Sequence, residues 1–445
     1  MKVINREWDL IAAENGNSIT NALDKDKVLR NATRFALKLG EHTWGGDKKR
    51  NLFDDYSWKN VDFEKARAKG SKNSSQYLNL ESTWWEQRQW GVTILMETLL
   101  ANQHPLAKKL IKGFNDLQPK TPDLSSLTKL NINEVVKPSK IFQCNMQNNN
   151  VVFGFDKYGR ISHLVEGNNI WADENNTLLQ LRYRSYSLKD VNEFMDSYVK
   201  LNATWTAQDY GKPGLPSDVE GKFWETNLSQ FYVNADDECS FAMKLNFEKE
   251  AFESYGAPEF VWISISLSNR NDDSSSSSSS NIFDVAIGMF NKTRTRLPES
   301  MFVRFEPFGR LIEDNNVIDW EASRIGEWVG IDNIVDGGSK HLYGVTDNGI
   351  RATNMKTNRV MSISSFDSTV ATFGKDTAYP SPTHVNPDVN DFGTSFVLWD
   401  NLWGTNYILW WPFEKPPKEY MDSATYFPDN WTTDFISRYQ ISFDD

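Results

Sequence analysis

The chain has 445 residues, of which 39% are hydrophobic and 24% charged, a composition typical of a folded globular protein with a large core. Its formal net charge of -12 argues against a nucleic-acid partner, because neutralising phosphates requires clustered lysine and arginine. The acidic balance indicates a solubilising surface, or else a site for polar or cationic groups.

Aromatic residues are abundant, with 17 tryptophans, 15 tyrosines and 27 phenylalanines. Such rings pack the cores of β-sandwiches, and they also stack on the apolar faces of sugars. Core packing is the default interpretation for any single ring.

The first part of the chain has the apolar spacing of helices. Residues 20–40 predict a helix that Asp24 or Asp26 can cap, and a long second helix is expected over 76–101. Shorter helices are expected near 61–68 and from Leu106 to Phe114, after Pro105. Residues 1–118 therefore predict a small antiparallel helical bundle.

Residues 119–129 carry two prolines and predict a linker. Over 130–445 the helical period gives way to short alternating apolar runs, separated by turn signals such as Asp347-Asn348-Gly349. This pattern predicts a large antiparallel β-sandwich, so the fold class is α+β, with two domains. Ser274 to Ser280, within a low-complexity stretch near 271–281, is interpreted as a solvated loop insertion.

The two cysteines, Cys144 and Cys239, lie far apart in the sequence and predict neither a disulfide framework nor a zinc finger; either one fits a buried thiol. No apolar run is long enough for a membrane span, and no signal peptide is evident at the N-terminus. The default expectation is therefore a cytoplasmic protein. Glycosylation sequons such as Asn31-Ala32-Thr33 and Asn291-Lys292-Thr293 arise by chance in an Asn-rich chain.

The stretch Gly40-Glu41-His42-Thr43-Trp44-Gly45-Gly46 is a candidate site, with Glu41 and Trp44 as possible sugar contacts. Its glycines favour a loop. His42 either caps the preceding helix or binds a metal, since neutral imidazole is a common zinc ligand. A zinc site needs about three protein ligands, and none lies nearby in the sequence.

Two further clusters combine aromatic and polar side chains. Trp84-Trp85-Glu86-Gln87-Arg88 lies on a predicted helix, where Trp84 and Arg88 can stack as a structural pair; alternatively, Trp84, Glu86 and Arg88 support His42. In the stretch from Trp399 to Tyr407, the side chains of Asp400, Trp403 and Asn406 suit a carbohydrate, and equally suit a capped turn.

The order of several segments resembles glycoside hydrolase family 38-like proteins, the α-mannosidase relatives, in an uncharacterised branch. These segments run through residues 25 to 415: Glu41-His42-Thr43-Trp44-Gly45, Glu81 to Arg88, Tyr158-Gly159-Arg160-Ile161, Leu181 to Tyr186, Gly211 to Leu215, Arg296-Leu297-Pro298-Glu299-Ser300, Gly338 to Leu342 and Leu402 to Asn406.

The resemblance implies a helical bundle followed by a galactose mutarotase-like β-sandwich. It also implies that His42 is the zinc ligand contributed after an N-terminal catalytic barrel, in an enzyme with zinc-dependent retaining chemistry. Too few residues precede His42 to hold that barrel, and no early His-x-Asp pair or nucleophilic aspartate is present.

The first hypothesis is therefore the C-terminal portion of such a glycosidase, inactive alone. It would have carbohydrate as partner, a barrel supplied in trans, and no cofactor of its own. The alternative is a free-standing carbohydrate-binding or scaffold protein.

Overall fold

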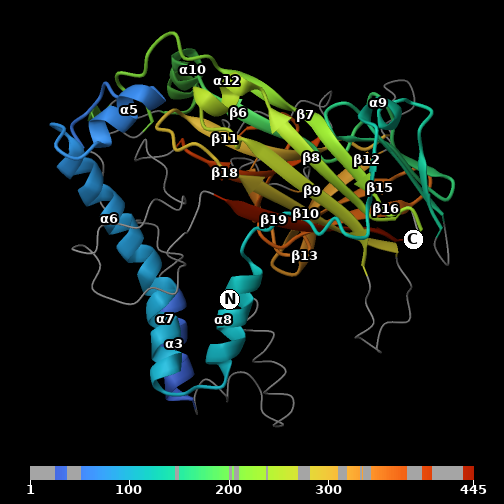
Figure 1. Cartoon of the computed structure of the whole chain (residues 1–445), viewed down its shortest axis with the longest axis horizontal. Helices are drawn as coiled ribbons and strands as arrows, with labels where there is room; N and C mark the ends of the chain where they lie inside the picture. Colours follow the sequence, from blue (N-terminus) through green and yellow to red (C-terminus); the bar gives the residue numbers. More distant parts are fainter. Residues whose placement is uncertain are drawn as a thin grey trace. The chain divides into compact units, whose positions relative to one another are not determined.

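The computed structural model describes residues 26–37, 52–145, 150–199, 203–204, 210–236, 239–268, 281–308, 318–330, 333, 342–377, 393–402 and 434–444. These residues form two compact units (Figure 1). A helical unit holds the described residues up to Pro119, apart from Trp58–Asn60. A β unit holds Trp58–Asn60 and the described residues from Lys120 onward. The predicted order, helices first and then a large antiparallel β domain, is confirmed.

The described part of the helical unit contains α3 (Lys27–Ala36), α5 (Asn60–Arg67), α6 (Ser74–Gly91), α7 (Thr93–Ala101) and α8 (Leu106–Asp116). The Asp26 side chain caps α3 by accepting the Leu29 N–H at 2.9 Å, as predicted. Apolar side chains of α3, α7 and α8 form its core: Leu29, Ala32, Ala36, Leu95, Met96, Leu99, Leu106, Ala107 and Leu110.

The prediction of one continuous helix over 76–101 is wrong. The helix ends at Gly91, and α7 starts at Thr93. Gly91 is followed by two β-branched residues, Val92 and Thr93, and all three have low helix propensity, which explains the break.

The β unit contains a 15-stranded main sheet and a four-stranded small sheet. The small sheet has the order β2 (Phe142–Cys144), β3 (Val151–Phe155), β4 (Ile161–Glu166), β5 (Asn169–Ala172). The main sheet runs β13 (Glu327–Gly330), β12 (Ile318–Arg324), β15 (Ile350–Asn354), β16 (Arg359–Ser365), β19 (Phe435–Asp444), β10 (Asn281–Phe290), β9 (Phe260–Leu267), β8 (Phe241–Phe247), β7 (Lys222–Val233), β6 (Gln180–Ser185), β11 (Glu299–Phe305), β18 (Thr394–Asp400), β17 (Val370–Phe373), β14 (Leu342–Gly344). Beside them, β1 (Thr128–Leu130) also pairs with β7.

The main sheet folds over itself at β7, where residues 222–225 pair with β6 and residues 226–233 pair with β8. We call β13 to β8 the long layer and β6 to β14 the short layer. Aromatic contacts join the two layers: Phe396 of β18 lies 5.2 Å from Tyr439 of β19, and Trp399 lies 5.0 Å from Phe435, between ring centroids. The layers therefore form a sandwich.

The small sheet covers another part of the long layer. The ring of Phe153 on β3 lies 5.3 Å from Phe241 and 5.1 Å from Phe283, on β8 and β10. On the opposite face of the long layer, Leu124 and Leu127 pack against a cluster that includes Trp262 and Phe290. Part of the predicted linker thus contributes to the core.

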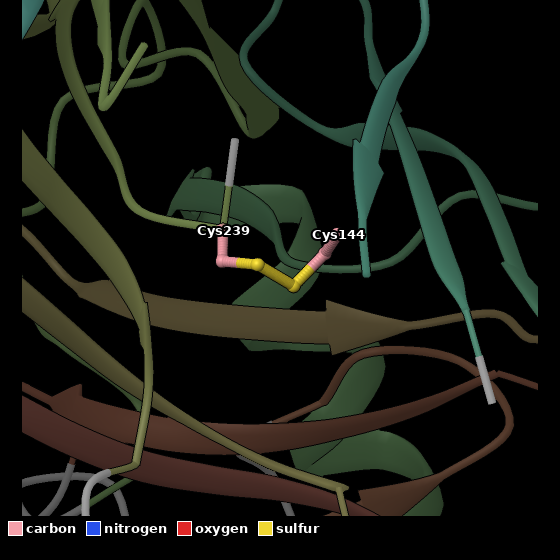
Figure 2. Close-up of a disulfide and its surroundings, with 2 residues drawn as sticks. All are labelled: Cys144 and Cys239. Carbon is pink, nitrogen blue, oxygen red and sulfur yellow. A yellow bond between two sulfur atoms is a disulfide. The ribbon is translucent and has the colours of Figure 1, made fainter. Parts of the chain in front are cut away.

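The expectation of buried thiols is also wrong. Cys144, at the end of β2, and Cys239, just before β8, form a disulfide with a Cα–Cα distance of 4.8 Å (Figure 2). Spacing in the sequence gives no sign of this pair because the two strands meet only through the tertiary fold. The serine run Ser274 to Ser280 lies outside the described residues.

Among the described residues of the β unit, further helices are α9 (Ile132–Val135), α10 (Leu188–Tyr198) and α12 (Lys249–Glu253). Helix α10 was not predicted, although its sequence has the signal of a capping box: the Ser187 hydroxyl accepts the Asp190 N–H, and the Asp190 carboxylate accepts the Ser187 N–H.

Candidate functional site

Most of the predicted site residues lie outside the part of the chain that the structure describes. This applies to Glu41, His42 and Trp44, and to Trp403 and Asn406. The backbone of α6 carries Trp84, Glu86 and Arg88, whose side chains are also outside the described set. Among these residues, Asp400 is the one whose side-chain surroundings are described, and the predicted roles of all of them, including Asp400, stay predictions.

Asp400 ends β18 and lies opposite Ser300 in the register with β11. Burial raises the pKa of its carboxyl to about 6, although the Leu402 N–H and the positive charge of Lys212 act in the opposite direction. Lys212 is fully buried, in a turn where its φ is 48°. Asp400 is thus a carboxyl that keeps its proton well above the pH at which a free aspartate loses it.

A buried polar cluster lies next to Asp400 and is centred on Glu299, the first residue of β11. Lys292 donates to Glu299 Oε1 at 2.8 Å, and the Tyr183 hydroxyl donates to Oε2 at 2.6 Å. The Gly256 N–H donates in turn to the Tyr183 oxygen at 2.8 Å. A side chain at position 256 would collide with the Glu299 carboxylate, so only glycine allows this close approach.

Burial sets the protonation behaviour of this cluster. It raises the pKa of Glu299 and lowers the pKa of Lys292, because each charge has left water. Burial and the nearby Glu299 carboxylate also raise the pKa of Tyr183. Since these three groups bond one another, the cluster holds the start of β11 in place beside Asp400 instead of presenting a reactive group.

Contacts near this cluster and along β7 link four described segments that carry the family resemblance in the β unit. Tyr186 N–H donates to Pro298 O at 3.0 Å, joining the 181–186 and 296–300 segments. Trp58 links the 211–215 and 296–300 segments: its Nε1 donates to Pro213 O at 3.2 Å, and the Arg296 guanidinium lies 4.4 Å from its ring centroid. Residues 158–161 contact β7, which pairs with β6: the Thr226 hydroxyl on β7 donates to Tyr158 O at 2.8 Å.

A network of charged side chains lies on the other face of the same strands. Arg182 and the buried Arg304 both pair with Asp376, at 2.7 and 2.8 Å. Arg304 also pairs with Glu306 at 2.7 Å. The Arg182 guanidinium lies 4.1 Å from the ring centroid of Phe223 on β7. Sequence patterns gave no hint of this network, because its members are joined only by the strand register and the β17–β18 connection.

A pocket of about 480 Å³ opens beside the small sheet. Residues of the segment after α9, of β3, β4 and the following turns line it, with side chains of both charges: Lys137, Lys140, Lys157, Asp156, Asp173 and Glu174. Its volume falls in the range of sites for small ligands. Its lining was not predicted either, since its members come from four separated segments.

Within the described ranges, no group of three or more histidine, cysteine, aspartate or glutamate side chains is placed to hold a metal ion. The predicted zinc ligand His42 lies outside these ranges. Among the same residues, no helix is long and apolar enough to cross a membrane.

Comparison with known proteins gives one family match. The model of the family described as "Domain of unknown function (DUF5054)" matches residues 16–275. No curated protein matches the chain.

Solved structures give weak likeness. A putative aldose 1-epimerase from Escherichia coli K12 is 9% identical, with a TM-score of 0.31, over 68% of this chain and 99% of that one. A galactose mutarotase-like protein from Lactobacillus casei is 8% identical, with a TM-score of 0.30, over 68% of this chain and 100% of that one. The Slr1438 protein from Synechocystis is 10% identical, with a TM-score of 0.29, over 71% of this chain and 99% of that one. Scores at this level carry no statement about function.

Proposed function

We propose a function from the premise that this chain belongs to the DUF5054 family, whose model spans more than half of its residues. The protein is the helical and β-sandwich part of a family 38-like glycoside hydrolase, related to the α-mannosidases, and its partner is carbohydrate. It supplies scaffold and substrate contacts, and a catalytic barrel acts with it in trans.

One observation supports this proposal above the others: three of the segments that carry the resemblance are linked by contacts in the β unit. The 181–186, 211–215 and 296–300 segments are joined there by the backbone and ring contacts of Tyr186, Trp58 and Arg296. Segments that matched by chance would be scattered over the unit. Their meeting is expected if they form one buried region that the family shares.

The chemistry that this proposal needs comes from the barrel. Retaining hydrolysis uses two carboxyl groups about 5 to 5.5 Å apart, one as nucleophile and one as acid. In the described part of the β unit, Glu299 is committed to Lys292 and Tyr183, so it is not a free nucleophile. Asp400, with its raised pKa, suits a hydrogen-bond donor to a sugar hydroxyl more than a nucleophile.

The test is co-expression of the chain with the catalytic barrel of a family 38-like relative. The expected result is a co-purifying complex that holds zinc and cleaves an aryl α-mannoside, while each part alone is inactive. The barrel with an unrelated β-sandwich is the matched control. A complex that does not form, or one that forms without zinc and activity, contradicts the proposal.

A second function, a free-standing carbohydrate-binding or scaffold protein, is favoured by the pocket beside the small sheet. Side chains of both charges suit a neutral ligand whose hydroxyl groups donate and accept hydrogen bonds. A glycan array on the isolated chain tests it, with Glu174→Ala in the lining against Glu327→Ala on β13 as control. Absence of binding to every sugar removes this alternative.

A further inference from the structure

The disulfide between Cys144 and Cys239 joins the small sheet to the main sheet across 95 residues of sequence (Figure 2). Both residues are almost fully buried, Cys144 at 0% and Cys239 at 3% exposure. They are the two cysteines of the whole sequence, so no other thiol of the chain competes for the pairing.

Such a bond indicates where the protein folds. Cytosolic reductants keep thiols reduced, so stable structural disulfides are typical of oxidising compartments. Burial of both cysteines restricts the access of small reductants to the bond once the unit has folded. An oxidising compartment differs from the cytoplasm, which was the default expectation because no signal peptide is evident in the sequence.

Compartments of that kind in eukaryotic cells also attach N-linked glycans at Asn-x-Ser/Thr sequons. Three sequons fall in the described part of the β unit: Asn175-Asn176-Thr177, Asn227-Leu228-Ser229 and Asn291-Lys292-Thr293. Their number is what an Asn-rich chain gives by chance. The surroundings of the three asparagine side chains differ, and this difference decides which of them can carry a glycan.

Two of the three asparagines can carry a glycan in the folded unit. Asn175 is exposed in the bend between β5 and β6, and Asn227 is exposed on the solvent face of β7. Asn291 is different, because its side-chain amide donates to Glu259 Oε2 at 2.7 Å and its φ is 54°. A sugar on that nitrogen would compete with the bond to Glu259.

We propose that the chain folds in an oxidising secretory compartment, where the Cys144–Cys239 disulfide forms and Asn175 and Asn227 become N-glycosylated. The two thiols lose two protons and two electrons, which a disulfide-bearing protein oxidant accepts by thiol–disulfide exchange. At each asparagine, the amide nitrogen bonds to C1 of an oligosaccharide and displaces a polyprenyl diphosphate, and the amide loses one proton.

The test uses the endogenous full-length chain, captured from the cells that make it after rapid alkylation of free thiols. The expected result is that Cys144 and Cys239 escape alkylation until a reductant is added under denaturing conditions. Peptide mass spectrometry after treatment with an amidase that removes N-glycans is expected to give aspartate at positions 175 and 227, and asparagine at 291.

Alkylation of both cysteines without reductant overturns the proposal, as does an unmodified amide at Asn175 and Asn227. Gel mobility before and after removal of N-glycans provides a second readout. N175Q and N227Q should each reduce the mobility difference by the amount of one glycan, and N291Q should leave it unchanged. Equal shifts in the wild type and in both N175Q and N227Q contradict the site assignment.

Discussion

Lys292 and Glu299 form an ion pair in the interior of the β unit, with 2.8 Å between Nζ and Oε1 and side-chain exposures of 1% and 0%. The pair joins the start of the loop after β10 to the first residue of β11. Because both charges have left water, removing one of them leaves the other buried without compensation.

We expect Lys292→Met to lower the free energy of unfolding by roughly 3 to 5 kcal/mol. The double variant Lys292→Met/Glu299→Leu should recover much of this loss, because it removes both charges. Urea unfolding followed by tryptophan fluorescence measures both. A double variant less stable than the single one would show that the carboxylate, and not the ion pair, holds the loop.

Asp400 predicts a specific pH dependence, because its pKa is raised from 3.8 to about 6. Between about pH 4 and pH 6 the folded protein keeps a proton that the unfolded chain loses, so stability falls as the pH rises through this window, by roughly 2 to 3 kcal/mol. Asp400→Asn stays neutral and should lack this part of the dependence. Denaturation curves from pH 4 to pH 7 compare the two proteins, and identical slopes would contradict the prediction.

Loss of the disulfide should destabilise the β unit. Its closed loop spans 95 residues, for which a chain-entropy model gives about 4 to 5 kcal/mol. We expect a clear drop in Tm for Cys144→Ala/Cys239→Ala, measured by circular dichroism. Reductant under mildly denaturing conditions should lower the Tm of the wild type toward that of the variant and leave the variant unchanged. A wild type with equal Tm in both conditions would refute the stabilising role.

His42→Ala tests the predicted zinc ligand. In a complex with a family 38-like barrel, the variant should lose zinc, measured by atomic emission, together with α-mannosidase-type activity. The Tm of the isolated chain should change little, because a metal ligand contributes to stability only when metal is bound. A large drop in Tm without metal would instead favour the helix-capping role of His42.

Much of the fold follows from local pattern. Apolar spacing predicted α3 and α8, and Asp26 was one of two candidate caps. The alternating runs 151–155, 260–267 and 282–289 predict strands that match β3, β9 and β10 to within about one residue. These succeed because capping and one-sided burial act between residues close in sequence. The break at Val92 shows what apolar spacing cannot predict. The spacing continues through this position, but three residues with low helix propensity interrupt the helix there.

The candidate site was much less predictable. Tyr183, Lys292 and Glu299 lie up to 116 positions apart, and no spacing rule connects them. Two signals were nevertheless present: Tyr183 and Glu299 both lie in segments that carry the family resemblance. The Cys144–Cys239 bond was equally hard to predict from the sequence, because the two cysteines come together only after the small sheet has packed on β8.

Strand β19 has a consequence for how the protein is made. It follows every other strand of the β unit in the chain, yet it lies in the interior of the long layer, hydrogen-bonded to β10 on one side and β16 on the other. During vectorial synthesis the long layer therefore exists as two half-sheets with facing open edges until residues 435–444 have left the ribosome. Chaperones that shield unpaired strand edges are expected to bind the nascent chain in that interval.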